Sequence, residues 1–316
     1  MKISIVGTGM IANEVAKALR AEAPEIDITA VCAHSNRTKA EALAHDYDIP
    51  KVYDDYDEML REDDADFVYL GIVNTAHYSY ARRALQAHRN VIVAKPFTTT
   101  AVDALALATL ARDNHLWLFE AVTTLHQPNF LLAKELLPRI APVRIVIANY
   151  SQYSSRYDRY LRGDVAPAFN PELGGGALND LGVYNVNAIV GLLGEPLHIN
   201  YHANRGFNGV DTAGVLVMEY RGVTAVSVCA KDSSGVSGIT IQGEKGTITI
   251  PSSPNAAAAV SLTVNGKTEQ WQKNKYSSRL IHEFKDFERM WQSGDYDAMS
   301  RYLDTSIAVV KVLTGK

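Results

Sequence analysis

The sequence predicts an α/β protein. A doubly wound parallel sheet is expected in its N-terminal part, and an α+β part with a large, mostly antiparallel sheet behind it. Three observations predict this. Short apolar strands alternate with helical stretches up to about residue 120. Beyond Pro128 the segments alternate between apolar and polar residues, with turn signals between them. The chain of 316 residues also exceeds what one hydrophobic core usually supports.

The alternation places the elements of the N-terminal part in order. Its strands are expected at residues 3–6, 28–33, 67–72, 91–94 and 116–119, and its helices at residues 11–22, 37–46, 55–61, 77–87 and 101–113. Strands that are apolar throughout are typical of a parallel sheet covered by helices on both faces. Ligands of such sheets bind beyond the carboxyl ends of the strands.

The C-terminal part begins with a helix at residues 128–138, and two further helices close the chain at residues 277–293 and 296–313. Turn signals such as Asn265-Gly266 predict antiparallel hairpins. The β-rich segments lie at residues 143–153, 198–201, 215–220, 224–229, 238–242, 247–250 and 260–264. We expect a first domain at residues 1–122 and a second, for substrate binding and oligomerisation, at residues 123–316. The free face of its sheet predicts a homodimer or homotetramer.

Composition excludes several classes of partner. A net charge of −4 provides no basic field for nucleic acid or an anionic membrane, and no apolar run is long enough to span a bilayer. Cys32 and Cys229 lie in separate apolar runs, so we expect buried thiols and a reducing, cytoplasmic location. No leader pattern precedes the first strand. Histidine and carboxylate spacings predict no metal site.

The glycine pattern at the start of the chain, Gly7-x-Gly9-x-x-Ala12, joins the first strand to the first helix. Glycine turns are common for structural reasons alone, but this strand–turn–helix context is typical of dinucleotide binding. Gly7 permits the tight turn, Gly9 lets a pyrophosphate approach the backbone, and Ala12 lets the helix pack closely. The helix N-terminus at Met10 and Ile11 offers N–H groups to the phosphates.

Two further segments carry candidate site residues. Lys95 directly follows a buried strand, where a cofactor should lie; a solvated strand-end lysine is the alternative, but Pro96 fixes the next turn.

Three glycines at residues 174–176 precede a helix on which Asp180, Tyr184 and Asn187 fall at i, i+4 and i+7, on one face. Such a stripe is usually a solvated face. The glycine run instead indicates a backbone that passes close to something.

Together these motifs resemble the glucose-fructose oxidoreductase/inositol dehydrogenase (Gfo/Idh/MocA) family of NAD(P)-dependent dehydrogenases. The likeness extends over essentially the whole chain, and the segment 119–124 resembles the dihydrodiol dehydrogenase-like branch. Two positions depart from the family pattern: Ala94 stands where the family has the Glu of Glu-Lys-Pro, and Ile72-Val73-Asn74 where it often has Thr-Pro-Asn. The resemblance is carried by residues 7–12, 74–77, 95–96, 119–121 and 174–184.

The resemblance implies roles for individual residues. Lys95 would hold the substrate hydroxyl and the nicotinamide ribose, Asp180 would position the substrate, and Tyr184 would transfer the proton. The cofactor would also contact Asn74 and His77. The resemblance also implies that the loop of His126 approaches the substrate. Asn187 is a candidate substrate contact from the helix face that it shares with Asp180 and Tyr184. Tyr157 is another, because the tyrosine-rich segment 150–160 suits a sugar or polyol, although the segment reads equally well as a strand running into a surface loop.

The chemistry is consistent with these roles. An alcohol loses a proton from oxygen as hydride leaves carbon, and an ordinary tyrosine hydroxyl, with a pKa of about 10, is a poor base at neutral pH. A neighbouring ammonium such as Lys95 would lower that pKa and, in the reverse direction, stabilise the alkoxide. The second strand ends without an acidic residue, so Ser35 and Arg37 favour NADP over NAD. Arg37 is alternatively a surface charge or a stacking partner for adenine.

The sequence therefore predicts an NAD(P)-dependent oxidoreductase that acts on a secondary alcohol of a sugar, an inositol or a trans-diol. The main alternative is a non-catalytic protein that senses NAD(P) or sugar on the same fold. A third is a lyase or glycosidase that oxidises its substrate only transiently. Fold alone does not decide between them.

Overall fold

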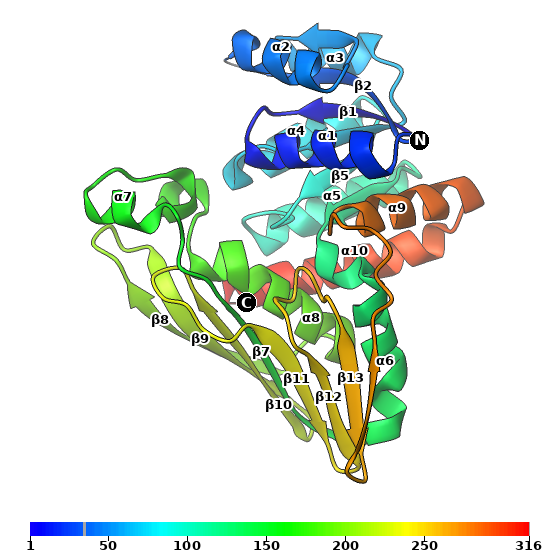
Figure 1. Cartoon of the computed structure of the whole chain (residues 1–316). Helices are drawn as coiled ribbons and strands as arrows, with labels where there is room; N and C mark the ends of the chain where they lie inside the picture. Colours follow the sequence, from blue (N-terminus) through cyan, green and yellow to red (C-terminus); the bar gives the residue numbers. More distant parts are fainter. Residues whose placement is uncertain (34–35, 316) are drawn as a thin grey trace. The chain divides into compact units, whose positions relative to one another are not determined.

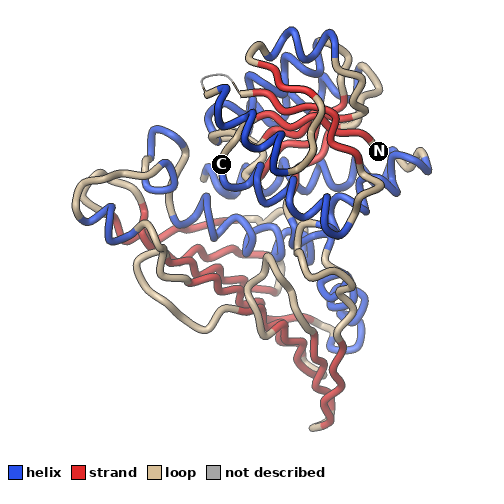
Figure 2. The backbone as a smooth tube through the Cα atoms, turned by 45° about the horizontal axis from the view of Figure 1, so that its top comes forward, coloured by secondary structure: helices blue, strands red, loops and turns tan. Residues whose placement is uncertain are grey.

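The computed structural model describes residues 1–33 and 36–315, and these form two compact units. Unit 1 comprises Met1–Ala121 and Glu283–Asp304, and unit 2 comprises Val122–His282 and the residues from Thr305 on. Figures 1 and 2 show their helices and strands. Each unit is described here by itself.

Unit 1 is built on a six-stranded sheet in the order β3-β2-β1-β4-β5-β6, and every neighbouring pair is parallel. The chain winds outward in both directions from β1 and β4, which confirms the doubly wound sheet and places its switch point there. The strands are β1 Lys2–Val6, β2 Asp27–Cys32, β3 Lys51–Tyr53, β4 Phe67–Leu70, β5 Asn90–Ala94 and β6 Leu118–Ala121.

Three helices of unit 1 begin where the sequence supplies a capping oxygen. The side chains of Asn36, Asp55 and Thr100 accept the backbone N–H three residues ahead and start α2, α3 and α5. Every residue of β4 is buried, so helices cover both faces of the central strands. The helices are α1 Met10–Glu22, α2 Arg37–Asp46, α3 Tyr56–Glu62, α4 His77–Gln86 and α5 Ala101–Asp113, with a short 3₁₀ turn, η1, at Asn74–Ala76.

Aromatic side chains attach a late helix, α9 (Ile281–Ser293), to the first sheet. The ring of Phe287 stacks on Phe119 with centroids 4.4 Å apart, and Trp291 meets Phe67 edge-on at 5.8 Å. Such pairs add stabilisation beyond the apolar area that they bury. The last helix, α10, spans Tyr296–Thr314.

Unit 2 contains an eight-stranded sheet in the order β14-β13-β12-β11-β7-β10-β9-β8. Among the described strand pairs of this second sheet, only β7–β10 is parallel, which confirms a mostly antiparallel sheet. The strands are β7 Val143–Ser151, β8 His198–Arg205, β9 Asp211–Tyr220, β10 Val223–Ala230, β11 Gly238–Gly243, β12 Gly246–Ile250, β13 Val260–Val264 and β14 Lys267–Trp271.

Two helices, α6 (Pro128–Ile140) and α8 (Val183–Leu193), lie against one face of this sheet (Figure 1). The buried amide of Asn185 donates to Ser227 Oγ at 3.0 Å and to Val228 O at 2.8 Å, and so fixes α8 on β10. Short elements lie between the larger ones: η2 Thr123–His126, α7 Tyr157–Leu161, η3 Pro167–Phe169, η4 Pro171–Leu173 and the π-helical turn η5 Leu178–Gly182.

Both cysteines are free and buried. Burial raises the pKa of each thiol, Cys32 and Cys229, to about 12. Within residues 1–33 and 36–315, no helix is both long and apolar enough to cross a membrane.

Candidate functional site

The first glycine of the N-terminal turn is required by the protein's own backbone. Gly7 has φ +109°, and a Cβ there would lie 2.3 Å from the carbonyl oxygen of Gly71. Its N–H donates to Cys32 O at 2.9 Å, so the turn is fixed to the end of β2. Any side chain at this position is therefore both strained and in collision.

The second glycine has no such internal reason. Gly9 is extended (φ −76°, ψ −176°), and a Cβ there would meet nothing of the protein within 4 Å. It stands at the N-terminus of α1, beside the exposed Met10, and Asn13 Nδ2 donates back to its carbonyl at 3.0 Å. A bare backbone at a helix N-terminus suits a phosphate group. These residues fit a dinucleotide.

Ala12 completes the pattern by packing. Ala12 is fully buried, and a Cβ placed on Gly71 would lie 3.5 Å from the Cβ of Ala12. α1 therefore approaches the segment after β4 closely, as the pattern requires. Ile11 is half-buried beside it.

Lys95 follows β5 at the carboxyl edge of the sheet and is half-buried. The turn that it begins, with a cis peptide to Pro96, is held from two sides. The imidazole of His77 contacts Pro96 O at 2.9 Å, and Glu120 Oε1 accepts from Phe97 N at 2.9 Å. Glu120 lies on the neighbouring strand β6 and was not singled out as a site residue from the sequence.

The structure places His77 beneath this turn. Its ring is fully buried, and its second nitrogen lies 3.2 Å from Ile72 O, so the residue joins the segments that follow β4 and β5. Burial lowers the pKa of His77 below its usual value of 6.5. Asn74, three residues earlier, begins η1 and is half-buried.

The residues expected to select the cofactor lie after β2. Ser35 lies outside the described residues. Arg37, the first residue of α2, pairs with Asp54 at 2.5 Å and with Glu41 at 2.8 Å, and these contacts raise its pKa. Its guanidinium is more than half exposed, so both ion pairs are weak and can exchange for another anion.

In unit 2, the glycine run at residues 174–176 lies close to other segments of the same chain. A Cβ on Gly175 would lie 2.5 Å from Pro167 O, and one on Gly176, which has φ +127°, would lie 2.0 Å from Asp211 Oδ1. Asp211 also accepts Leu178 N at 2.7 Å, which satisfies an N–H at the start of the following helix. Internal packing thus accounts for the close approach that the run predicts.

The polar stripe expected on this helix is not a solvated face. A π-helical turn, Leu178–Gly182, carries Asp180 and changes the spacing to α8. All residues from 183 to 190 are buried. Asn187 is fully buried, and its Nδ2 donates to Val183 O at 3.0 Å within its own helix.

The carboxylate of Asp180 is paired with a lysine that sequence reasoning missed. Lys231 Nζ lies 2.7 Å from Asp180 Oδ2 and donates to Ala168 O at 2.6 Å. The lysine side chain is 2% exposed, whereas that of the aspartate is 35% exposed. A signal was present, because Lys231 directly follows a strand, as Lys95 does.

Tyr184 is buried beside a second tyrosine and an ordered amide. Its ring centroid lies 5.8 Å from that of Tyr150, whose hydroxyl accepts from Asn255 Nδ2 at 3.1 Å. Asn255 is held in turn by Thr123 Oγ1, which donates to its carbonyl at 2.8 Å. Asp180 and Tyr184 therefore begin one helix whose surroundings are fixed by hydrogen bonds.

The remaining predicted substrate residues lie in separate surroundings. His126 ends η2 and is buried. Tyr157 is half-buried in an aromatic cluster, edge-on to Tyr153 at 5.5 Å and stacked with Tyr160 at 5.9 Å. These contacts give Tyr157 a packing role in the segment after β7.

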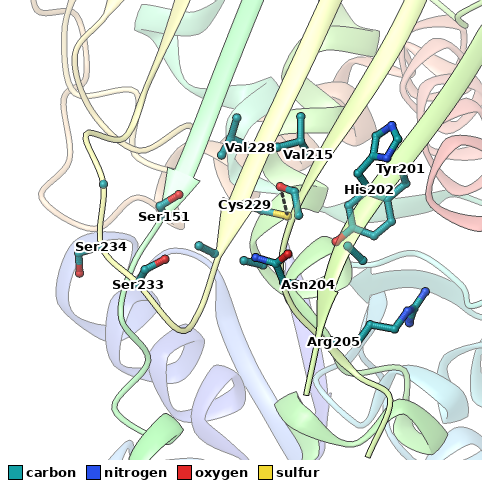
Figure 3. A pocket seen from close by; sticks show the side chains of 15 residues that line it. Ser151, Tyr201, His202, Asn204, Arg205, Val215, Val228, Cys229, Ser233 and Ser234 are labelled. Atoms are coloured by element: carbon teal, nitrogen blue, oxygen red, sulfur yellow. Dashed lines mark hydrogen bonds between the residues drawn. The ribbon is translucent and has the colours of Figure 1, made fainter. Parts of the chain in front are cut away.

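A hollow of about 670 Å³ lies over the ends of β8, β9 and β10 (Figure 3). Polar side chains on its wall include Ser151, Asn204, Arg205 and Ser233. None of the site residues predicted for unit 2 lines it in the described part of the chain, so we assign it no part in the candidate site. Among the same residues, no three His, Cys, Asp or Glu side chains are grouped as a metal ion would need.

Comparison with known proteins identifies both parts of the chain. Residues 1–121 match the model of an oxidoreductase family with an NAD-binding Rossmann fold, and residues 139–249 match the GFO/IDH/MocA C-terminal domain.

Curated relatives cover most of the chain. The uncharacterized oxidoreductase YgjR of Escherichia coli is 34% identical over 250 residues, which is 79% of this chain and 76% of that protein. The scyllo-inositol 2-dehydrogenase (NADP(+)) IolU of Bacillus subtilis is 28% identical over 99% of this chain and 95% of its own. A trans-1,2-dihydrobenzene-1,2-diol dehydrogenase of Xenopus laevis is 30% identical over 84% of this chain and 79% of that protein.

Solved structures share the fold. KijD10, a 3-ketoreductase from Actinomadura kijaniata in complex with NADP and TDP-benzene, superposes with a TM-score of 0.83 at 23% identity, over 100% of this chain and 97% of that one. The aldose-aldose oxidoreductase of Caulobacter crescentus, complexed with glycerol, superposes with a TM-score of 0.83 at 20% identity, over 99% of this chain and 96% of that one.

Proposed function

Because the chain belongs to the GFO/IDH/MocA family of oxidoreductases, we propose that it transfers hydride between NAD(P) and a secondary alcohol of a sugar, an inositol or a trans-diol. One observation carries the proposal. Asp180 and Tyr184 stand together at the start of a buried helix, each held by its own contacts. A protein that only senses a nucleotide or a sugar needs no such acid and hydroxyl.

The bound nicotinamide cofactor would accept or donate the hydride, and the protein would orient it. We propose that the turn from Gly7 to Ile11, which includes the exposed Met10, holds the phosphates of the cofactor. Asn74 and Lys95 would lie along the cofactor. The bare backbone at Gly9 supports this assignment. We favour NADP, because Arg37 can exchange weak ion pairs for a 2′-phosphate and because IolU is named as NADP-dependent.

The proton would move through Tyr184. We propose that its phenolate oxygen takes the proton from the substrate alcohol in the oxidation and that its hydroxyl returns the proton in the reduction, while the Lys95 ammonium stabilises negative charge on the substrate oxygen. Asp180 would accept a hydrogen bond from a substrate hydroxyl and so fix its orientation.

The relatives support the substrate class. IolU is named for scyllo-inositol, and several other relatives are named for a dihydrobenzene trans-diol. Both compounds carry neighbouring hydroxyl groups on a six-membered ring. We propose that this chain takes a small polyhydroxylated molecule of that kind. The two free, buried thiols support a reducing compartment such as the cytoplasm.

We also propose a homo-oligomer through the free face of the second sheet. Ser227 faces α8, so the alternation along β10 turns Val226 and Val228 to the opposite face. Their partners across the ladders, Ile147 and Val215, are 38% and 37% exposed. Light scattering after gel filtration tests this: Ile147→Glu is expected to give a smaller particle than the wild type.

The function is tested in two steps. The cofactor-stripped protein is titrated with NADPH and NADH by fluorescence, and then screened with NADP and NAD against scyllo-inositol, myo-inositol, aldoses and trans-cyclohexanediol. Cofactor reduction by a polyol supports the proposal. Binding without turnover would favour a sensor, and turnover without net cofactor reduction would favour transient oxidation.

Variants then test the assigned residues. Tyr184→Phe and Lys95→Ala should each lower kcat by about 10²- to 10⁴-fold, the range for loss of a general acid–base group. Circular dichroism and the NADPH dissociation constant of Tyr184→Phe should match the wild type. Near-normal rates in both variants would remove this mechanism.

A further inference from the structure

Lys231 is a buried cation that the proposed mechanism does not yet use. It follows β10, and its backbone is held on both sides: its N–H donates to Thr212 O at 2.8 Å, and its carbonyl accepts from Ser154 N at 2.8 Å. The side chain is 2% exposed. Lysine is rarely buried to this extent without a partner.

The contacts of the ammonium include a carboxylate, a carbonyl and an aromatic ring from other segments of the chain. It donates to Asp180 Oδ2 at 2.7 Å and to Ala168 O at 2.6 Å, and it lies 4.3 Å from the centre of the Phe169 ring. A carboxylate, a carbonyl and an aromatic face all favour a cation. The geometry therefore compensates for the desolvation of the charge.

The pair is asymmetric in a way that stability alone does not explain. The lysine is enclosed, but the aspartate side chain keeps 35% of its surface exposed. A carboxylate that reaches solvent needs no buried ammonium for its own solvation, and buried ion pairs are often no better for stability than apolar residues. What the lysine adds is a fixed location and charge for that carboxylate.

We propose that Lys231 is a positioning residue that holds the carboxylate of Asp180 ionised and in one orientation toward the substrate. This inference rests on the proposed function. An ionised carboxylate only accepts hydrogen bonds. Asp180 held in this way selects substrates that carry a further hydroxyl group beside the reacting one.

The test is a double-mutant cycle with Lys231→Met, Asp180→Ala and the double variant; Met keeps much of the lysine's length without its charge. Lys267→Met, at an exposed site on β14 of the same sheet, is the matched control. Initial rates are measured with NADP and scyllo-inositol, or with the polyol that the screen turns over best. NADPH binding and thermal unfolding are measured on every variant.

Lys231→Met should lower kcat/KM by about 10²-fold, the order of loss expected from a small misplacement of a positioning group. The double variant should be no slower than Asp180→Ala, because the lysine acts only through the aspartate. NADPH affinity should stay within about twofold in all variants, since no residue of the glycine turn changes. Lys267→Met should match the wild type.

Two results would overturn the inference: a wild-type kcat/KM in Lys231→Met, or losses that add in the double variant. Thermal unfolding tests the coupling of Lys231 and Asp180 without any need for turnover. Asp180→Ala leaves a buried ammonium without its carboxylate, so the double variant should unfold at a higher temperature than Asp180→Ala. If the wild type oxidised no polyol, the proposed function would fail. The unfolding cycle would still show whether Lys231 and Asp180 are coupled, and additive shifts would overturn the inference.

Discussion

The backbone N–H of Phe97 donates to Oε1 of Glu120 across 2.9 Å, and both residues are buried. The bond crosses from β6 to the turn that begins with Lys95. The residue before that lysine is Ala94, which has no carboxylate, so the carboxylate that reaches this turn comes from the neighbouring strand. The location of Lys95 therefore depends on a residue 25 positions later in the chain.

Glu120→Ala should damage both stability and turnover. It leaves the buried N–H of Phe97 without its acceptor, which costs about 1–3 kcal/mol of unfolding free energy, and it frees the turn that carries Lys95. Glu120→Gln keeps an acceptor oxygen and should retain most of both properties. Urea unfolding and initial rates check this. A Gln variant as impaired as the Ala variant would show that the charge matters, not the hydrogen bond.

Gly9→Ala and Gly7→Ala should separate cofactor binding from folding. At Gly9 a Cβ meets no protein atom, so unfolding free energy should change by less than about 0.5 kcal/mol, while NADPH affinity falls at least about tenfold. At Gly7 the positive φ and the carbonyl of Gly71 should make Ala cost about 1–3 kcal/mol. Fluorescence titration and denaturant unfolding measure the two effects. Unchanged NADPH binding in Gly9→Ala would contradict the phosphate assignment.

Most of the fold follows from patterns that are local in sequence. Apart from β3, the strands of unit 1 are buried along all or most of their length, and their expected ranges meet the observed ones within a few residues. Two strands were missed for the same physical reason. β3 has three half-buried residues, and β14 is exposed along most of its length, so neither shows an apolar period. Strand pairing is non-local, and the parallel pair β7–β10 was not predicted.

The candidate site shows the same limit. Lys95, Asp180 and Tyr184 stand in local motifs and were found from the sequence. Lys231 and Asp211 were not, because they contact residues 51 and 33 positions away and no local pattern records those contacts. The π-helical turn also has no sequence signature that distinguishes it from an α-helix. For that reason the three-residue stripe was read as one face.

Arg37→Ala should change cofactor selectivity without affecting the fold. Loss of a charge-assisted hydrogen bond to a 2′-phosphate, about 1.5–3 kcal/mol, should weaken NADPH binding by tenfold or more and leave NADH binding unchanged. Asp54→Asn removes a carboxylate that competes for the same guanidinium and should strengthen NADPH binding. Parallel fluorescence titrations with both cofactors measure this. Equal losses for NADPH and NADH would indicate that Arg37 contacts the adenine or ribose they share.

His77 should make stability depend on pH in mildly acidic solution. Burial lowers its folded-state pKa below 6.5, so below that pH the unfolded chain binds a proton that the folded chain does not. Its contribution to the unfolding free energy is therefore complete above 6.5 and declines as the pH falls further. Between about pH 7.5 and 5.5 the wild type should lose more stability than His77→Gln, measured by urea unfolding. His45→Gln, at an exposed site, should lose as much as the wild type. An equal loss in His77→Gln would place the titrating group elsewhere.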